Sequence, residues 1–191
     1  MRFRHATSRD LPAIEKLHRR IAFSAEMDGI AIFEGIRPVS FFEEAIEEGR
    51  ILLLEENRVL YGYLVMRGDV REAFYPESLS EEKALALLLK TEPKFEEDVV
   101  VLETMGVDPR YRKKGYGRQL FRYASEQHRN GLLVFTVPKE NPEAIAFFRA
   151  MGSIARGLIV IEGQSPNKQV LFSYRLNERT ATYKARNNIH S

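Results

Sequence analysis

The most constraining feature of this chain is an apolar segment that runs into a glycine-rich turn and then an amphipathic segment. Residues 99–107 have the apolar, partly β-branched composition of a buried strand. The turn carries Arg112-x-x-Gly115-x-Gly117, and residues 119–124 then follow a helical pattern. Glycines let backbone N–H groups approach a ligand closely, and the start of a helix adds its dipole. The sequence therefore predicts a strand, a turn and a helix that bind a phosphate-bearing ligand.

The rest of the chain alternates between strand and helix patterns. Strands are expected at residues 2–6, 51–54, 59–66, 99–107, 132–137, 154–161 and 169–176. Helices are expected at residues 40–48, 80–90, 115–129 and 141–151, and from a capping box, Thr7-x-x-Asp10, through Ile21. Residues 24–37 read as a loop because they contain two glycines after acidic residues. This order predicts an α/β fold in which a mixed sheet of about seven strands is flanked by helices.

Length and composition indicate one globular domain, at residues 1–176, followed by a polar tail at 177–191. The chain is 44% hydrophobic and 29% charged, which is ordinary for a globular protein. It has no cysteine, which excludes disulfides, thiolate metal ligands and a cysteine nucleophile. No apolar run approaches the roughly 20 residues of a membrane span, and the start lacks a signal peptide. We therefore expect a cytoplasmic protein with no membrane partner.

Charge and histidine spacing exclude two further classes of partner. The 29 basic and 27 acidic residues leave a net charge of +2, so no global field favours nucleic acid. The four histidines show no metal-ligand spacing. We expect neither a nucleic-acid partner nor a metal ion.

The glycine-rich turn matches neither common nucleotide motif. A Walker loop would need Gly-x-x-x-x-Gly-Lys-Ser/Thr, which is absent. A dinucleotide fingerprint would need a third glycine where Leu120 stands. The cations of this segment, taken alone, could equally form a solvated cluster or an RNA contact; they are Arg110, Arg112, Lys113, Lys114 and Arg118. Gly115 and Gly117 favour phosphate binding, because a solvated helix start does not need two glycines.

Three separated motifs, in the correct order, resemble the GCN5-related N-acetyltransferase (GNAT) superfamily. They are Thr7-x-x-Asp10, Arg112-x-x-Gly115-x-Gly117 and Asn141-x-x-Ala144-x-x-Phe147-Phe148-x-x-x-Gly152. The resemblance covers roughly residues 1–176 and implies the GNAT fold. It also implies that acetyl-coenzyme A, or another acyl-coenzyme A, donates an acyl group to a primary amine of a small molecule or peptide. A homodimer is compatible with this reading.

The resemblance further implies which residues contact the coenzyme. They are Met105, Gly106, Val107, Arg112, Lys113, Lys114, Gly115, Tyr116, Gly117, Arg118, Asn141, Phe147 and Phe148. The pantetheine arm would pair with the backbone of Met105 and Val107, and a backbone N–H there would hold the thioester oxygen. A kink at Gly106 would splay this strand from residues 132–137 and open the cleft. Asn141 has a second reading as the N-cap of the helix that starts at Pro142.

Glu103 is the candidate general base for an amine that attacks the thioester directly. Strand alternation predicts that it shares a face with Val101 and Met105, in apolar surroundings where desolvation makes a carboxylate a better base. Alternatively, Glu103 pairs with an arginine or lies at the sheet edge. Neutralising a lysine-like amine at pH 7 costs about 4.6 kcal/mol, whereas an α-amino group costs only about 1 kcal/mol. A strong base is thus needed mainly for alkyl amines.

The general acid is not identified by the sequence. Many GNAT proteins carry a tyrosine where this chain has Phe148, and that tyrosine protonates the leaving thiolate. Tyr111, Tyr116 and Tyr123 are substitutes or packing residues. The absent hydroxyl leaves a non-catalytic acyl-coenzyme A-binding or regulatory domain as an alternative to an acyltransferase, with an RNA-contacting module as a second rival.

Overall fold

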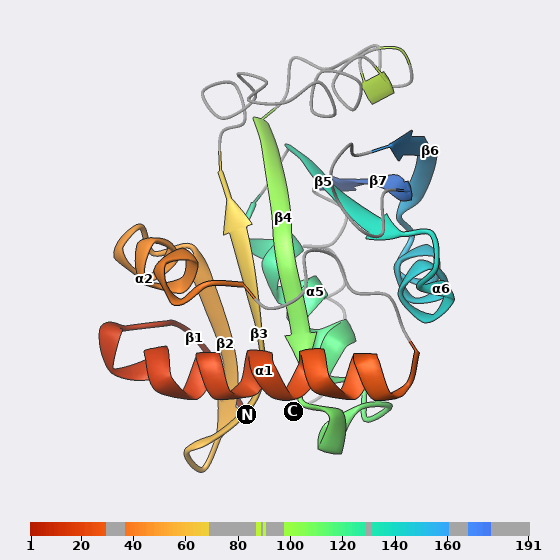
Figure 1. Ribbon diagram of the computed structural model, residues 1–191. Helices are drawn as coiled ribbons and strands as arrows, with labels where there is room; N and C mark the ends of the chain where they lie inside the picture. The colour runs from red at the N-terminus through yellow and green to blue at the C-terminus, as the bar shows by residue number, and fades with distance from the viewer. Residues whose placement is uncertain are drawn as a thin grey trace, which may run out of the picture.

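A mixed sheet of seven strands lies at the centre of the computed structural model (Figure 1), which describes residues 1–29, 37–68, 87–88, 90, 98–128, 131–160 and 168–176. The strands are β1 (Arg2–His5), β2 (Ile51–Glu56), β3 (Val59–Arg67), β4 (Asp98–Val107), β5 (Gly131–Pro138), β6 (Ile154–Val160) and β7 (Lys168–Leu176). Their order is β1-β2-β3-β4-β5-β7-β6. Only β4 and β5 pair in parallel, and the other neighbours are antiparallel. The predicted fold class is confirmed.

Helices cover both faces of this sheet. They are α1 (Leu11–Met27), α2 (Val39–Glu47), α5 (Tyr116–Gln127) and α6 (Pro142–Ala150), with short 3-10 turns η1 (Ser8–Asp10) and η2 (Pro109–Tyr111). Helix α1 crosses one face near the carboxyl end of β4, and α5 lies behind the sheet (Figure 1). Leu87, Leu88 and Lys90 are helical, but the rest of the helix predicted at 80–90 lies outside the described residues, as does the tail at 177–191.

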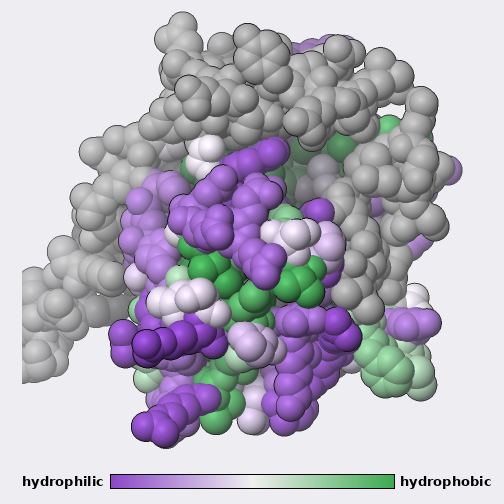
Figure 2. Space-filling model, turned by 60° about the vertical axis from the view of Figure 1, so that its left-hand side comes forward, coloured by the Kyte–Doolittle hydropathy of each residue, from purple (hydrophilic) through white to green (hydrophobic). Residues whose placement is uncertain are grey.

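Alternating residues of β2 and β3 build a separate core on each face. Leu53 and Tyr63 pack with Ile14 of α1 and Phe42 of α2. The intervening residues, such as Leu54, pack with α5 and α6 on the other face. Full burial of one such leucine contributes about 1.5–3 kcal/mol. Among the described residues no helix has the length and apolarity to cross a bilayer. Hydrophilic side chains dominate the surface that carries α2 (Figure 2).

The first helix is longer than predicted. The capping box is confirmed, because the Thr7 N–H donates to Asp10 Oδ2 at 2.8 Å. The helix then continues to Met27, so the loop expected from residue 24 is wrong for its first four residues. Ala25 is 2% exposed, which shows that the apolar face extends one turn beyond Ile21. Termination follows where Gly29 adopts φ +65°, a left-handed conformation that glycine tolerates.

The irregularity of β4 lies at Glu103 and not at Gly106. Val65 pairs with Thr104 and Met66 with Leu102, so Glu103 is an extra residue in the register, a β-bulge. Gly106 instead admits helix α1, because a Cβ there would lie 2.4 Å from Ile21 Cδ1. The predicted position of the kink is therefore wrong.

The predicted separation of two central strands is confirmed. The parallel ladder between β4 and β5 runs from Asp98↔Gly131 to Val101↔Val134 and stops there. Both strands nevertheless continue, β4 to Val107 and β5 to Pro138. The strands thus diverge beyond Val101, and the two cavities described next lie at this divergence.

Candidate active site

A cavity of about 620 Å³ lies between α1, the end of β4, the glycine-rich turn and the starts of α5 and α6. All the predicted coenzyme contacts except Lys114 line it, namely Met105, Gly106, Val107, Arg112, Lys113, Gly115, Tyr116, Gly117, Arg118, Asn141, Phe147 and Phe148. Residues from four separate elements therefore meet at one place, as the resemblance implied.

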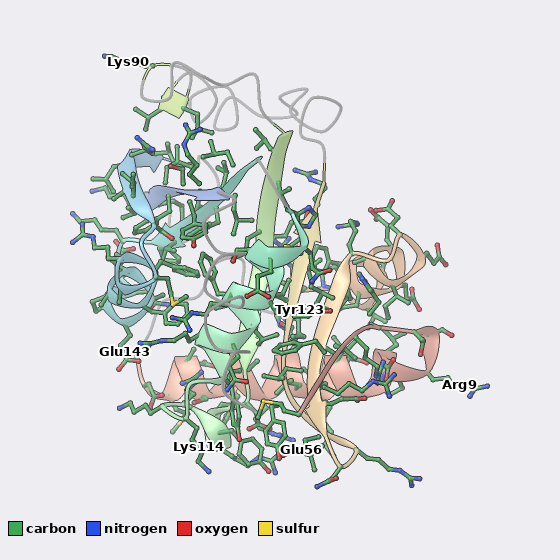
Figure 3. All side chains as sticks on the ribbon, turned by 180° about the vertical axis from the view of Figure 1, so that it is seen from behind. Arg9, Glu56, Lys90, Lys114, Tyr123 and Glu143 are labelled. Atoms are coloured by element: carbon green, nitrogen blue, oxygen red, sulfur yellow. The ribbon has the colours of Figure 1, made fainter. Side chains whose placement is uncertain are left out.

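Lys114 lies outside this lining. Its side chain is exposed and its ammonium lies 5.4 Å from the centroid of the Tyr111 ring. Figure 3 shows Lys114 at the turn and Glu143 at the start of α6. The turn therefore faces the cavity with Arg112, Lys113 and Arg118, and Lys114 lies beside it.

The turn has the conformation of an anion-binding helix start. Lys113 and Gly115 adopt φ values of +61° and +84°, and Gly115 is the N-cap of α5. A Cβ on Gly115 would meet nothing within 4 Å, so the space beside it is open. The first N–H groups of a helix lack intrahelical acceptors and carry its positive dipole end. Together with Arg112, Lys113 and Arg118, this geometry fits a diphosphate.

Asp108 fixes the turn to helix α1. Its carboxylate is fully buried, accepts a hydrogen bond from the Arg110 N–H at 3.0 Å, and pairs with the guanidinium groups of Arg20 and Arg110. Burial alone would raise the pKa of Asp108, but the hydrogen bonds from Arg110 and the charge of Arg20 lower it. The position of α1 is thus coupled to the approach of the chain to the turn.

A second, smaller cavity of about 150 Å³ adjoins the first. The two share Ile21, Met105, Asn141, Ala144 and Phe148 as lining residues. Only the smaller one is lined by residues from the start of the divergence, namely Leu102, Glu103 and Thr104. A group bound in the larger cavity can therefore meet one bound in the smaller.

Glu103 lies in the smaller cavity but in charged surroundings. Its Oε2 accepts a hydrogen bond from Arg50 Nη1, and its Oε1 lies 3.8 Å from Arg67 Nε. The predicted apolar environment is wrong, and the alternative of pairing with an arginine is what the structure shows. Leu102 and Met105 pack against the same core, so the bulge interrupts the alternation that placed Glu103 and Met105 on one face.

His18 and Tyr63 line the smaller cavity and were not predicted as site residues. His18 Nδ1 lies 2.6 Å from Tyr63 Oη, and the Arg37 N–H donates to His18 Nε2 at 2.9 Å. Burial, and secondarily the charge of Arg37, lower the pKa of His18. Burial raises the pKa of Tyr63, which a hydrogen bond from the Thr104 side chain only partly offsets. A signal existed, because His18 follows Ile14 at helical spacing and so belongs to the buried face.

Of the candidate tyrosines, Tyr111 and Tyr116 line the larger cavity, whereas Tyr123 does not. Tyr111 and Tyr116 belong to an aromatic group around Tyr61, with both rings 4.7 Å from the Tyr61 ring. This group borders the larger cavity. Tyr123 stacks on Phe3 at 4.2 Å and lines neither cavity.

Phe148 itself is 7% exposed and fills an aromatic cluster, with its ring 4.3 Å from that of Phe135. Asn141 has the alternative role weighed from the sequence, because its Oδ1 accepts a hydrogen bond from the Ala144 N–H at 3.0 Å. It is thus the N-cap of α6, and it also lines both cavities. Within the described ranges no group of three or more His, Asp or Glu side chains could hold a metal ion.

This sheet, with its two diverging central strands and a glycine-rich helix start, defines an acetyltransferase fold. Residues 32–152 match the model of the Acetyltransferase (GNAT) family, and the chain belongs to that family.

The chain is also similar to individual proteins of known name. It is 38% identical over 66 residues to N-alpha-acetyltransferase RimI of Mycobacterium tuberculosis (strain ATCC 25618 / H37Rv), a match that spans 35% of this chain and 40% of that protein. The matched segment is thus less than half of that relative.

Two solved structures share the fold. The structure of yncA from Salmonella typhimurium with acetyl-CoA has a TM-score of 0.63 and 16% identity, over 93% of this chain and 95% of that one. Arabidopsis thaliana Naa50 with the bisubstrate analogue CoA-Ac-MVNAL has a TM-score of 0.62 and 16% identity, over 91% and 97%.

Proposed function

We propose that this chain transfers an acetyl group from acetyl-coenzyme A to the α-amino group of a peptide or protein. The observation that carries the proposal is the junction of the two cavities. The larger has a glycine-rich, cationic helix start at one end, and the smaller contains Glu103. A thioester held in the first would therefore face an amine in the second.

The residues around the larger cavity fit a coenzyme. The turn from Arg112 to Arg118 would hold the diphosphate through N–H groups and cations. Beyond Val101, β4 has no described strand partner on the side of β5. The backbone of Met105 and Val107 is thereby available to pair with the extended pantetheine arm, as an edge strand pairs with a peptide.

The reaction forms one C–N bond and breaks one C–S bond. The neutral amine attacks the thioester carbon, its nitrogen then loses a proton, and the coenzyme leaves as a thiolate that takes a proton from water. A thiol has a pKa near 8.5, so its thiolate is a tolerable leaving group without a dedicated acid. Glu103 is the proposed acceptor of the amine proton.

The proposed acceptor is an α-amine because the candidate base is already engaged. Arg50 occupies Glu103 Oε2, and Arg67 lies beside Oε1. Such an arrangement suits an amine that is largely neutral on arrival. The cost of neutralisation differs by about 3.6 kcal/mol between lysine-like and α-amino groups, which corresponds to roughly 400-fold in rate. The similarity to an N-alpha-acetyltransferase supports the same class.

Thiol release from acetyl-coenzyme A tests the proposal with one peptide in two forms. A peptide with a free N-terminus should react. Its N-terminally blocked form, in which one lysine carries the available amine, should react at least roughly 100-fold more slowly. Equal rates would contradict the assignment of the acceptor. Coenzyme binding without thiol release for any amine would favour a binding or regulatory domain, the reading that Phe148 suggests.

The role of Glu103 is tested by Glu103→Gln, with Glu44→Gln as its matched control. Both carboxylates bond Arg50, but Glu44 is exposed and lines neither cavity. Glu103→Gln should lower kcat by roughly 10²–10⁴-fold, the usual contribution of a general base, with an unchanged Kd for the coenzyme. Equal kcat values for the two variants would remove Glu103 from the mechanism.

A further inference from the structure

A buried series of polar groups leads from Arg37, through His18 of helix α1, to the β-bulge in the acceptor cavity, the smaller of the two cavities. It consists of the Arg37 N–H, the His18 ring, and the hydroxyl groups of Tyr63 and Thr104. His18 is 6% exposed and Tyr63 is 1% exposed. Both nevertheless line this cavity together with Thr104, which adjoins Glu103 at the bulge.

The hydrogen-bond pattern determines which group donates to which. Because His18 Nε2 accepts from the Arg37 N–H, it carries no hydrogen, and the neutral ring carries its proton on Nδ1. His18 Nδ1–H therefore donates to Tyr63 Oη. The Tyr63 oxygen thereby accepts from His18 Nδ1–H and from the Thr104 hydroxyl, and its own O–H remains available as a donor at the cavity wall.

This series of hydrogen-bonded groups is suited to holding a substrate and not to moving a proton. Proton transfer from Tyr63 to a thiolate would be uphill, since burial raises the pKa of Tyr63 further above that of a thiol. His18 cannot accept a proton at Nδ1, which already carries one. A neutral hydroxyl in a dry site remains a good hydrogen-bond donor.

The chemistry of the attack limits what this donor can bind. A hydroxyl that donated to the amine nitrogen would occupy the lone pair that must attack the thioester. Its productive partner is therefore another acceptor atom of the same substrate. In a peptide N-terminus that atom is the carbonyl oxygen of the residue that carries the amine.

We propose that His18 and Thr104 orient the hydroxyl group of Tyr63 to hydrogen-bond the carbonyl oxygen of the acceptor's first residue. This hydroxyl thereby selects amines that carry a neighbouring carbonyl over plain alkyl amines. The inference rests on the proposed function and adds the residues that make the selection. His18 and Thr104 are positioning residues, and Tyr63 is the specificity residue.

Tyr63→Phe tests the selection with two acceptors, a short peptide with a free N-terminus and an alkyl amine that has no carbonyl. The loss of one hydrogen bond should lower kcat/KM for the peptide roughly 5- to 15-fold. The value for the alkyl amine and the Kd for the coenzyme should stay within about twofold. The matched control is Tyr123→Phe. Tyr123 lies on α5, away from Lys114 and Glu143 (Figure 3). This substitution should leave kcat/KM unchanged for both acceptors. Equal losses for both acceptors would overturn the proposal.

Substitutions at His18 separate positioning from packing. His18→Phe should reproduce the selective loss seen in Tyr63→Phe. His18→Gln keeps one donor and one acceptor and should recover at least half of the lost kcat/KM. Failure of both variants to change the ratio between the two acceptors would overturn the positioning role.

A spectroscopic measurement tests the same hydrogen bonds of His18 without turnover. Nitrogen-15 spectra of the histidine rings should show His18 protonated at Nδ1, and Tyr63→Phe should shift that signal. Protonation at Nε2 would overturn the inference. If wild type releases no thiol with any amine, the proposed function fails. If the wild type does release thiol, and Tyr63→Phe leaves the selection between the two acceptors intact, only this inference fails.

Discussion

Replacement of Gly117 by aspartate should abolish tight coenzyme binding without disturbing the fold. Gly117 lies in the first turn of α5 and lines the larger cavity. A Cβ at this position would lie 3.6 Å from the Phe147 ring and 3.7 Å from Val107 Cγ2, which are ordinary contacts. The aspartate can therefore be accommodated, and its effect will come from charge and occupied space at the proposed diphosphate site.

The magnitude follows from two terms. Two negative charges of a diphosphate about 5 Å from a carboxylate, at an effective dielectric constant of about 40, give roughly 3 kcal/mol of repulsion. One displaced backbone hydrogen bond to a charged oxygen adds about 1.5–3 kcal/mol. The sum, about 4.5–6 kcal/mol, predicts that Kd rises by about three to four orders of magnitude.

Calorimetric titration with coenzyme A provides the assay, and Gly117→Ala provides the control. Alanine adds the same Cβ without the charge, so its Kd should rise less than about tenfold. Salt supplies a second signature, because the Debye length falls from about 10 Å at 0.1 M to 3 Å at 1 M. The gap between the variants should therefore narrow at high salt. Equal affinities for Gly117→Asp and Gly117→Ala at low salt would refute the location of the diphosphate.

Two further predictions concern stability. Asp108→Asn should lower the free energy of unfolding by about 2 kcal/mol in urea titrations. This loss is smaller than for a fully buried ion pair because Arg20 and Arg110 reach water. An unchanged urea midpoint would show that Asp108 does not hold the turn. Burial lowers the pKa of His18 below 6.5, so below that pH the unfolded chain binds more protons than the folded one. The free energy of unfolding should therefore fall as the pH is lowered through this range. His18→Gln should flatten this slope, while His128, whose pKa burial also lowers, keeps its share; identical slopes would contradict the buried, neutral ring.

The sequence could predict features that depend on neighbours along the chain. Gly115 and Gly117 mark the turn because their spacing reports local backbone needs. The strand pattern of residues 59–66 agrees with β3 for the same reason. The bulge at Glu103 was missed because it depends on how β4 registers with β3.

Contacts between distant residues were equally beyond the sequence. Arg50 lies 53 residues before Glu103, and Tyr63 lies 45 residues after His18. Nothing in local periodicity reports such pairs. The end of α1 was missed because glycine and acidic residues after Ser24 suggested a loop, whereas burial of Ala25 favours another helical turn.

Within three turns, helix α1 lines both cavities and pairs with Asp108. His18 faces the acceptor cavity, Arg20 pairs with Asp108 just before the glycine-rich turn, and Ala25 lines the larger cavity. A rigid helix cannot move one of these side chains without moving the others. Ligands of the two cavities should therefore influence each other's affinity reciprocally, with α1 as the mechanical link between them.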